Sequence, residues 1–184
     1  METDEVLLAR SGRDPTAFEP LVERLGATVY RYLARRAPDA APDLLGEVWL
    51  RAFASRRTFD PERGTAAPWL LGVARHVLLA HWNSTRPARN QPGAGPEPAW
   101  EDWAAVDARL DAAAVAPALR AALAELPAAE RELLLLVSWE QLSPTEAAVV
   151  VGIPAGTARS RLHRARASMR DRLATVRNDL TGGL

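Results

Sequence analysis

The sequence has no cysteine and no lysine, and only three histidines among its 184 residues. Without cysteine, the chain can form no disulfide, thiol nucleophile or thiolate ligand for zinc. Of the histidines, His76 and His81 lie five residues apart and do not share a helix face, and His163 lies far along the chain. This spacing argues against a histidine metal site, so we expect neither a metal nor a cofactor.

Long hydrophobic runs are also missing. No stretch approaches the roughly 20 uncharged apolar residues that a membrane-spanning helix requires. The first five residues, METDE, are acidic and carry no secretory pattern. We therefore expect a cytoplasmic protein without membrane insertion. Hydrophobic residues still make up 48% of the chain, enough for the packed core of one medium domain or two small ones.

The charges balance overall but are unevenly distributed. The 23 arginines match 23 acids, which gives a formal net charge of zero. Residues 154–177, however, carry seven arginines and one aspartate, whereas residues 92–126 carry two arginines and six acids. A strongly basic helix can bind a polyanion such as nucleic acid. A solvated basic face is the alternative, and charge alone does not decide between the two.

Proline and glycine concentrate in residues 84–98, STRPARNQPGAGPEP. Because proline removes a backbone donor and fixes φ, we expect neither a helix nor a central strand there. On both sides, apolar residues recur at helical spacing, and we find no convincing strand alternation. The predicted fold is all-α, with two small helical domains, residues 1–86 and 114–178, joined by a flexible linker, residues 87–113.

Four helices are expected in the first domain. Asp14 is a good N-cap, and Pro15 fits the first helical position that follows it. Residues 56–65, RRTFDPERGT, are predicted to form a loop because they contain Asp-Pro and Gly. The predicted helices run from about Asp4 to Ser11, from Pro15 to about Arg36, from about Ala41 to Ala54 and from about Ala67 to Asn83.

The third of these helices carries a broad apolar face and a mixed outer face. At about 100° per residue, Asp43, Glu47 and Leu50 project away from the apolar side. An outward leucine flanked by carboxylates is typical of a small docking patch, although isolated exposed leucines are also common. The predicted core face consists of Leu44, Leu45, Val48, Trp49, Ala52 and Phe53.

The fourth helix directs Trp69 and His76 away from its core face, toward the side where the preceding loop must fold back. An aromatic ring beside hydrogen-bonding groups can hold an unstacked nucleobase. The alternative is that Trp69 completes the core and His76 is a surface residue. The predicted core residues of this helix are Leu70, Val73, Ala74, Val77 and Leu78.

In the second domain, Pro127 is expected to start a helix. A capping box then marks the start of a short helix that reaches Val151, with Ser143 as N-cap and Glu146 three residues later. Pro144 lies at the first helical position. The short helix is the first element of a recognisable motif.

Gly152 follows that helix as a turn residue able to take a positive φ. Ile153 is predicted to plug the core, and Pro154 to open a long helix that reaches about Arg172. A short helix, a glycine turn and a longer basic helix form the pattern of a helix-turn-helix.

The long helix separates into a core face and a polar face. Thr157 and Arg159 flank the polar face, and arginine can contact guanine through two hydrogen bonds in the major groove. A helical hairpin that binds protein through arginine is the alternative, and the coincidence of cap, turn and basic face favours DNA. The core face is Ala158, Leu162, Ala165 and Met169, and the polar face is Gly156, Ser160, His163, Arg164 and Ala167.

Two groups of segments resemble the sigma factors of bacterial RNA polymerase. Residues 43–53 (DLLGEVWLRAF), 59–64 (FDPERG) and 68–75 (PWLLGVAR) resemble sigma region 2. Residues 142–148 (LSPTEAA) and 156–166 (GTARSRLHRAR) resemble sigma region 4. With a short linker and no third domain between them, the chain resembles the extracytoplasmic-function (ECF) group. This resemblance implies a factor, not an enzyme, that binds core polymerase and directs promoter-specific transcription initiation.

The resemblance also implies roles for the surfaces. One set would dock on the clamp helices of the polymerase's largest catalytic subunit: Asp43, Glu47, Leu50 and Arg51. A second would hold a flipped base of the −10 promoter element: Phe59, Asp60, Arg63, Trp69, Arg75 and His76. A third would read the −35 element as duplex DNA, near the flap of the second-largest subunit: Thr157, Arg159, Ser160, Arg161, His163 and Arg164. An anti-sigma factor is a further partner common in the group.

The chain departs from the family pattern at His76, where asparagine is usual. A stand-alone helix-turn-helix regulator, with residues 1–91 as a sensing or dimerising domain, is the alternative function. An enzyme is disfavoured because the sequence shows no paired carboxylates in a cleft-forming motif, no phosphate-binding glycine loop and no nucleophile with a base.

Overall fold

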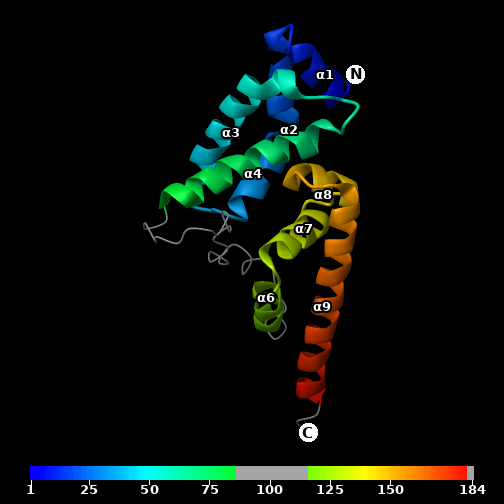
Figure 1. The fold of residues 1–184 in the computed structure, drawn as a ribbon. Coiled ribbons are helices and arrows are strands. Elements are labelled where there is room, and N and C mark those ends of the chain that lie inside the picture. Colours follow the sequence, from blue (N-terminus) through cyan, green and yellow to red (C-terminus); the bar gives the residue numbers. More distant parts are fainter. Residues whose placement is uncertain (86–115, 182–184) are drawn as a thin grey trace. The chain divides into compact units, whose positions relative to one another are not determined.

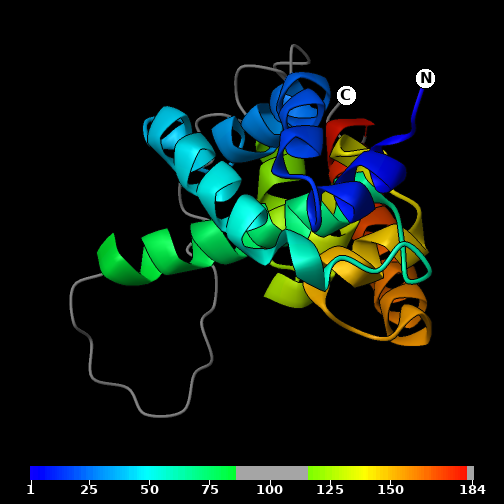
Figure 2. The ribbon, with the colours of Figure 1, turned by 90° about the horizontal axis from the view of Figure 1, so that it is seen from above.

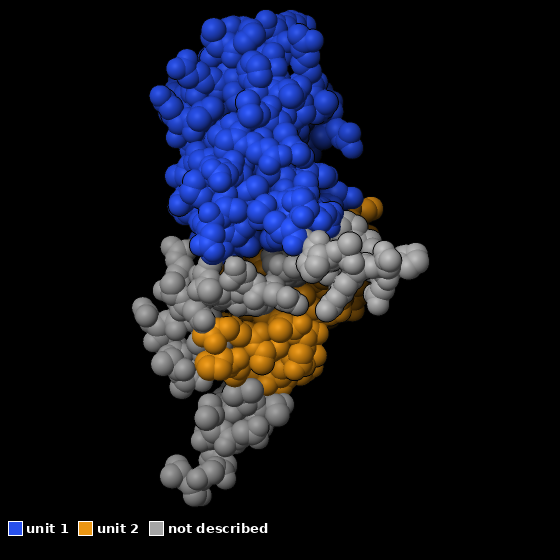
Figure 3. All heavy atoms as spheres, turned by 90° about the vertical axis from the view of Figure 1, so that its left-hand side faces the viewer, with its two compact units in different colours: residues 1–105, 149–152 blue, residues 106–148, 153–184 orange. Residues whose placement is uncertain are grey.

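The computed structural model describes residues 1–85 and 116–181 of the chain, and within these residues every regular element is a helix. The all-α fold class is therefore confirmed. The chain divides into two compact units, residues 1–105 with 149–152 and residues 106–148 with 153–184 (Figure 3). The predicted linker, residues 87–113, lies outside the described residues, so the predicted domain boundaries stay a prediction.

The first unit contains four α-helices and two 3₁₀ turns in its described part (Figure 1). α2, α3 and α4 pack against one another, and α1 packs on α2 and α4 (Figures 1 and 2). The elements are α1 (Asp4–Ser11), η1 (Pro15–Phe18), α2 (Glu19–Ala34), α3 (Ala41–Ser55), η2 (Arg56–Thr58) and α4 (Ala66–Thr85).

The prediction of one helix from Pro15, directly after the Asp14 cap, to about Arg36 is wrong at its start. Asp14 does cap, accepting a hydrogen bond from the Thr16 amide at 3.1 Å, but it closes a 3₁₀ turn, and α2 begins only at Glu19. Pro20 gives the reason, because it has no N–H to bond the Thr16 carbonyl and so cannot carry an α-helical ladder through this turn. The helix predicted from Asp4 to Ser11 is confirmed.

The core of the first unit follows the predicted apolar stripes at their centres but not at their edges. On α3, Leu44, Val48 and Ala52 are buried, but Phe53 is 38% exposed. At about 100° per residue, Phe53 lies well off the centre of that stripe. Its ring packs edge-on against Phe18, with centroids 5.3 Å apart. Partial burial also applies, for the same geometric reason, to three other residues predicted as core: Leu45, Trp49 and Val73.

The second unit has α6 (Ala116–Ala124), α7 (Ala128–Trp139), the start of α8 (Pro144–Val151) and α9 (Ala155–Thr181) in its described part, and residues 149–151 of α8 are grouped with the first unit. α6 was not predicted, and α9 runs beyond the expected end near Arg172. α7 and α6 both pack on α9. The predicted core face of α9 is buried: Ala158, Leu162, Ala165 and Met169.

The turn between α8 and α9 forms largely as predicted. The amide of Ser143 donates to the Glu146 carboxylate at 2.8 Å, and the Glu146 amide donates to the Ser143 hydroxyl at 3.2 Å, which completes the capping box. Gly152 adopts a φ of +76°, a conformation that favours glycine. Ile153, however, is only half-buried, so its role as a core plug is not borne out.

Three prolines were predicted to begin helices in this unit. Pro144 begins α8 as predicted, but Pro127 and Pro154 lie one residue before α7 and α9. Pro127 is the N-cap of α7, with a φ of −52° and a ψ of 136°. Pro154 likewise precedes α9, and its carbonyl accepts from the Ala158 amide at 3.0 Å. None of the helices in the described part of the chain has the length and apolarity that crossing a membrane requires.

Candidate functional site

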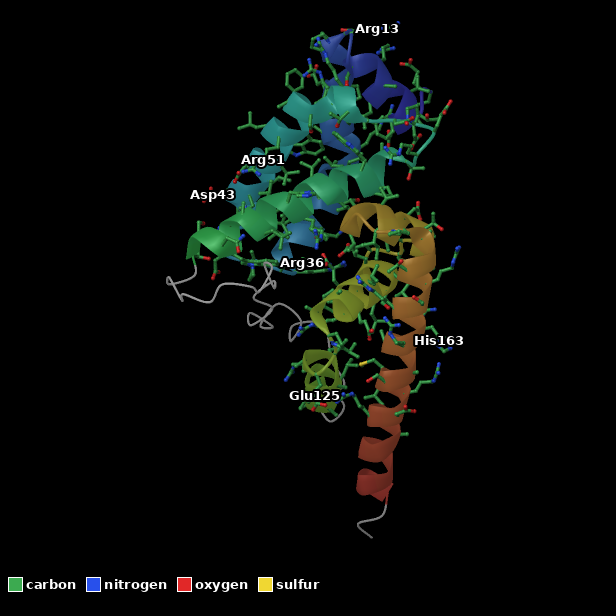
Figure 4. All side chains as sticks on the ribbon, viewed as in Figure 1. Arg13, Arg36, Asp43, Arg51, Glu125 and His163 are labelled. Atoms are coloured by element: carbon green, nitrogen blue, oxygen red, sulfur yellow. The ribbon has the colours of Figure 1, made fainter. Side chains whose placement is uncertain are left out.

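The outer face of α3 gathers the four residues predicted to dock on a partner. Leu50 is 74% exposed, the largest exposure among the large hydrophobic residues of the helices whose burial the structure describes. Arg51 pairs with Glu47 one turn earlier, with 2.5 Å between Nη2 and Oε1. Asp43 lies in the first turn, and Figure 4 shows Asp43 and Arg51 on the outer side of the helix. The result is an apolar tip surrounded by charge, the composition of a small protein interface.

The segment between α3 and α4 folds back onto α4, as the sequence predicts. The rings of Phe59 and Trp69 pack edge to face, with centroids 5.8 Å apart and planes at 70°. The Asp60 carboxylate accepts from the Glu62 amide at 3.0 Å, and its carbonyl accepts from the Arg63 amide at 3.1 Å. Asp60 therefore shapes the turn, while Arg63 is exposed.

His76 lies on the exposed side of α4. Its Nδ1 is 2.7 Å from the carbonyl oxygen of Gly72, one turn earlier. Because a carbonyl oxygen only accepts, Nδ1 is the donor in this contact. Arg75, the neighbouring predicted residue, is half-buried. α4 thus carries an aromatic ring that packs on Phe59 of the loop and, seven positions later, an exposed imidazole.

α9 presents most of its predicted residues to solvent. Arg159, Ser160, His163 and Arg164 are exposed, and His163 is visible on the outer side of the helix in Figure 4. The Ser160 hydroxyl donates to the Thr157 carbonyl at 3.0 Å. Half-buried positions are held by the other two members of the predicted set: Thr157 and Arg161.

Arg164 has a partner that sequence reasoning did not assign. Its Nε lies 2.9 Å from Oε1 of Glu130 on α7. The Arg164 side chain is 61% exposed, but that of Glu130 is only 13% exposed. The partners are 34 positions apart. No local pattern signals the pair, because it arises only when α7 packs on α9.

Residues 21–87 match the family model for Sigma-70 region 2, and residues 117–169 match that for Sigma-70, region 4. The ECF RNA polymerase sigma factor SigC of Mycobacterium tuberculosis is 35% identical over 169 residues, covering 90% of this chain and 87% of the relative. This chain belongs to the ECF sigma factors. Another member, SigF of Caulobacter vibrioides, is 33% identical over 166 residues, covering 87% of each chain.

Solved structures with the same fold include two complexes. CnrH bound to the cytosolic domain of CnrY aligns with a TM-score of 0.63 at 22% identity, covering 95% of this chain and 99% of that one. The sigma factor RpoE bound to the anti-sigma factor NepR, from Bartonella quintana, aligns with a TM-score of 0.56 at 19% identity, covering 85% and 96%. As an ECF sigma factor, the chain binds RNA polymerase and directs promoter-specific initiation, and the stand-alone regulator is not favoured.

Proposed function

We propose that three surfaces of this ECF sigma factor divide the work of initiation. The outer face of α3, centred on Leu50, docks on the clamp helices of the polymerase's largest subunit. Its support is the exposed apolar side chain between charged neighbours, which gives both a buried contact and orientation once a partner covers it. Asp43, Glu47 and Arg51 supply the charges.

The loop before α4 captures a flipped base of the −10 element. Extruding a base costs a few kcal/mol of unstacking, which aromatic stacking and pocket contacts offset. Phe59 and Trp69 supply the aromatic surface, His76 and Arg75 supply hydrogen-bonding groups, and the exposed Arg63 is placed for the strand's phosphates. Asp60 holds the turn that presents them.

The polar face of α9 reads the −35 element in the major groove, near the polymerase flap. Arg159 and Arg164 contact base edges, while Thr157, Ser160, Arg161 and His163 add contacts to bases or phosphates. The linker, residues 87–113, joins the region 2 domain (1–86) to the region 4 domain (114–178). It raises the effective concentration of the second contact once the first is made.

We further infer that the protein works in the cytoplasm, where bacterial polymerase meets the genome, and that it is not an enzyme, because the polymerase supplies the chemistry. An anti-sigma factor is a second partner class. The support for it is that the structural neighbour RpoE was solved bound to the anti-sigma factor NepR.

The observation that carries the proposal is that the two sigma-region matches each contain an exposed set of the predicted contact residues. The test is transcription from fragmented genomic DNA by purified core polymerase, with and without the full chain, followed by sequencing of transcript ends. We expect new start sites that share two sequence elements at fixed spacing. Normal core binding without any promoter-specific start would refute the proposal.

A mobility-shift assay distinguishes a sigma factor from a stand-alone helix-turn-helix regulator. A regulator binds its operator tightly without polymerase, whereas a sigma factor of this type requires core polymerase for tight, specific binding. Comparing the same promoter fragment with the chain alone and with the chain plus core therefore distinguishes the two.

A further inference from the structure

The C-terminal end of α1 contacts the start of the segment that joins α3 to α4. Nε of Arg56 donates to the Ser11 carbonyl at 2.9 Å, and Nε of Arg57 donates to the Gly12 carbonyl at 3.1 Å. The last carbonyls of a helix lack partners within the helix and carry partial negative charge, so two guanidinium groups are favourable there. These contacts fix η2 against α1.

The N-terminal end of α1 contacts the other end of the same segment. Oε1 of Glu5 accepts from the amide of Ala66, the first residue of α4, at 3.2 Å. That amide is among the donors that have no acceptor within their own helix, and Ala66 is 1% exposed. A carboxylate at a helix N-terminus also interacts favourably with the helix dipole. Glu5 therefore acts as a cap for α4 from 61 positions away.

The charge state of Glu5 is consistent with this contact. Its pKa is lowered from 4.5, chiefly by the hydrogen bond from its own backbone N–H and also by those from the Ala66 amide and the Thr3 hydroxyl, against the opposing effect of burial. Near neutral pH the side chain is thus an ionised acceptor for the Ala66 amide.

Between these anchors lies the loop that carries Phe59, Asp60 and Arg63. Holding both ends of a loop restricts the conformations between them, which lowers the entropy cost of forming one binding geometry. Within the loop, the Phe59 ring packs on Trp69, and the Asp60 carboxylate accepts from the Glu62 amide. The contacts of α1 at both ends therefore add to those within the loop and constrain its geometry.

We propose that α1 is a positioning element for the base-capture loop and that Glu5 is its positioning residue at the α4 end. Glu5 does not touch DNA. It sets the geometry in which Phe59, Arg63 and Trp69 meet the flipped base, and so contributes to discrimination between bases. This inference rests on the proposed function of the loop.

The chain offers a matched control on the same helix. Asp4, the neighbouring acid, accepts from Nη1 of Arg24 at 3.0 Å and so ties α1 to α2 instead of to the loop. Asp4→Ala removes one carboxylate from the same turn of α1 without touching the α4 cap. Glu5→Gln is the conservative variant, because its amide oxygen still accepts from Ala66.

The first measurement is hydrogen exchange on the full-length chain. Glu5→Ala should speed amide exchange across residues 59–66 by about tenfold, the equivalent of losing one hydrogen bond to a charged group. Glu5→Gln should restore most of the protection, and Asp4→Ala should leave this segment unchanged. Equal exchange of residues 59–66 in Glu5→Ala and Asp4→Ala would overturn the inference.

The second measurement is base discrimination by the holoenzyme. Templates built from a promoter found in the transcription experiment, and differing only at the captured −10 base, are compared for strand opening by 2-aminopurine fluorescence. Glu5→Ala should reduce discrimination about three- to tenfold, with core affinity and −35 preference unchanged. If the wild type does not discriminate, the proposed function fails. If the wild type discriminates and Glu5→Ala equals it, this inference alone fails.

Discussion

The two proposed DNA-binding surfaces are built differently. Arg159, Ser160 and His163 project from one helix, so the helical repeat alone decides which way they face. Phe59 and Arg63 lie on a loop whose position depends on contacts made by α1. The helical surface resists small changes elsewhere in the chain, whereas the loop surface responds to residues that never approach DNA. Substitutions should therefore act locally on α9 and at a distance on the loop.

The largest effect is expected on α9. Arg159→Glu removes a guanidinium and adds a charge repelled by phosphates, and each base contact of this kind contributes roughly 1–3 kcal/mol. We expect transcription from promoters with a matched −35 element to fall about a hundredfold. Arg170→Glu, the same charge change at another exposed position of α9, is the control. Equal losses in both variants would indicate a general charge effect and contradict specific readout.

Core docking should be separable from both DNA surfaces. Leu50→Asp places a charge at the centre of the docking patch, and loss of a buried leucine contact costs roughly 1.5–3 kcal/mol. We expect the affinity for core polymerase, measured by fluorescence anisotropy, to fall about thirtyfold. The melting temperature of the variant should equal that of the wild type. Val22→Asp, at an exposed position on α2, should bind core normally. Normal core affinity of Leu50→Asp would exclude this docking surface.

A moderate effect is expected on the loop. Phe59→Ala removes the edge-to-face contact with Trp69, an interaction of about 0.5–1.5 kcal/mol. Opening of duplex promoter DNA should slow about two- to tenfold, and a pre-melted template should lose less. Phe59→Tyr keeps the ring and should behave like the wild type. The loop proposal predicts no change in −35 preference, so a change there would count against it.

Two helix caps differ in the same way: Ser143 caps α8 from the adjacent residue, whereas Glu5 caps α4 from 61 positions away. Ser143→Ala breaks the local capping box of α8 and should cost about 1 kcal/mol, or roughly 4–8 °C in the melting temperature of a unit of this size. Ser138→Ala, at an exposed position on α7, is the control for thermal melting. Because this cap is local, base discrimination at −10 should not change. A change would show that the two surfaces are not independent.

The smallest effect concerns acid stability. The pKa of Glu5 is lowered in the folded chain from its ordinary 4.5, so its contribution is present above that pH and is lost as the pH falls through the lower folded value. Urea unfolding should show wild type more stable than Glu5→Gln at pH 7, with the difference shrinking below about pH 4.5. A difference that grows on acidification would contradict the assigned contact.

The sequence predicted what depends on local periodicity. The buried face of α9, the capping box and Gly152 all follow from residues within a few positions of one another. The predictions that were wrong concern features that the local apolar pattern does not determine. Pro20 interrupted a helix that the Asp14 cap and Pro15 predicted to start earlier, and Phe53 lay at the edge of its stripe, where contacts with Phe18 and Arg56 decide its environment.

The residues of the candidate site also differ in whether local sequence could place them. Leu50 and the polar face of α9 could be placed from the helical repeat, and the resemblance to sigma factors gave them roles. The contacts of Arg164 with Glu130, and of Ala66 with Glu5, join residues 34 and 61 positions apart. Such pairs exist only once the helices pack, so no reading of neighbouring residues reveals them.

The ion pair between Arg164 and Glu130 reduces the net free energy that Arg164 can contribute to DNA binding. An arginine that already has a carboxylate partner exchanges one anion for another when it meets DNA, so its net gain is a difference between two similar attractions. Glu130 also remains close by, where it repels any phosphate that approaches loosely. If Arg164 contacts the −35 element as proposed, it therefore adds little to non-specific binding and more to the choice among sequences, because only a well-aligned guanine compensates for the partner it leaves.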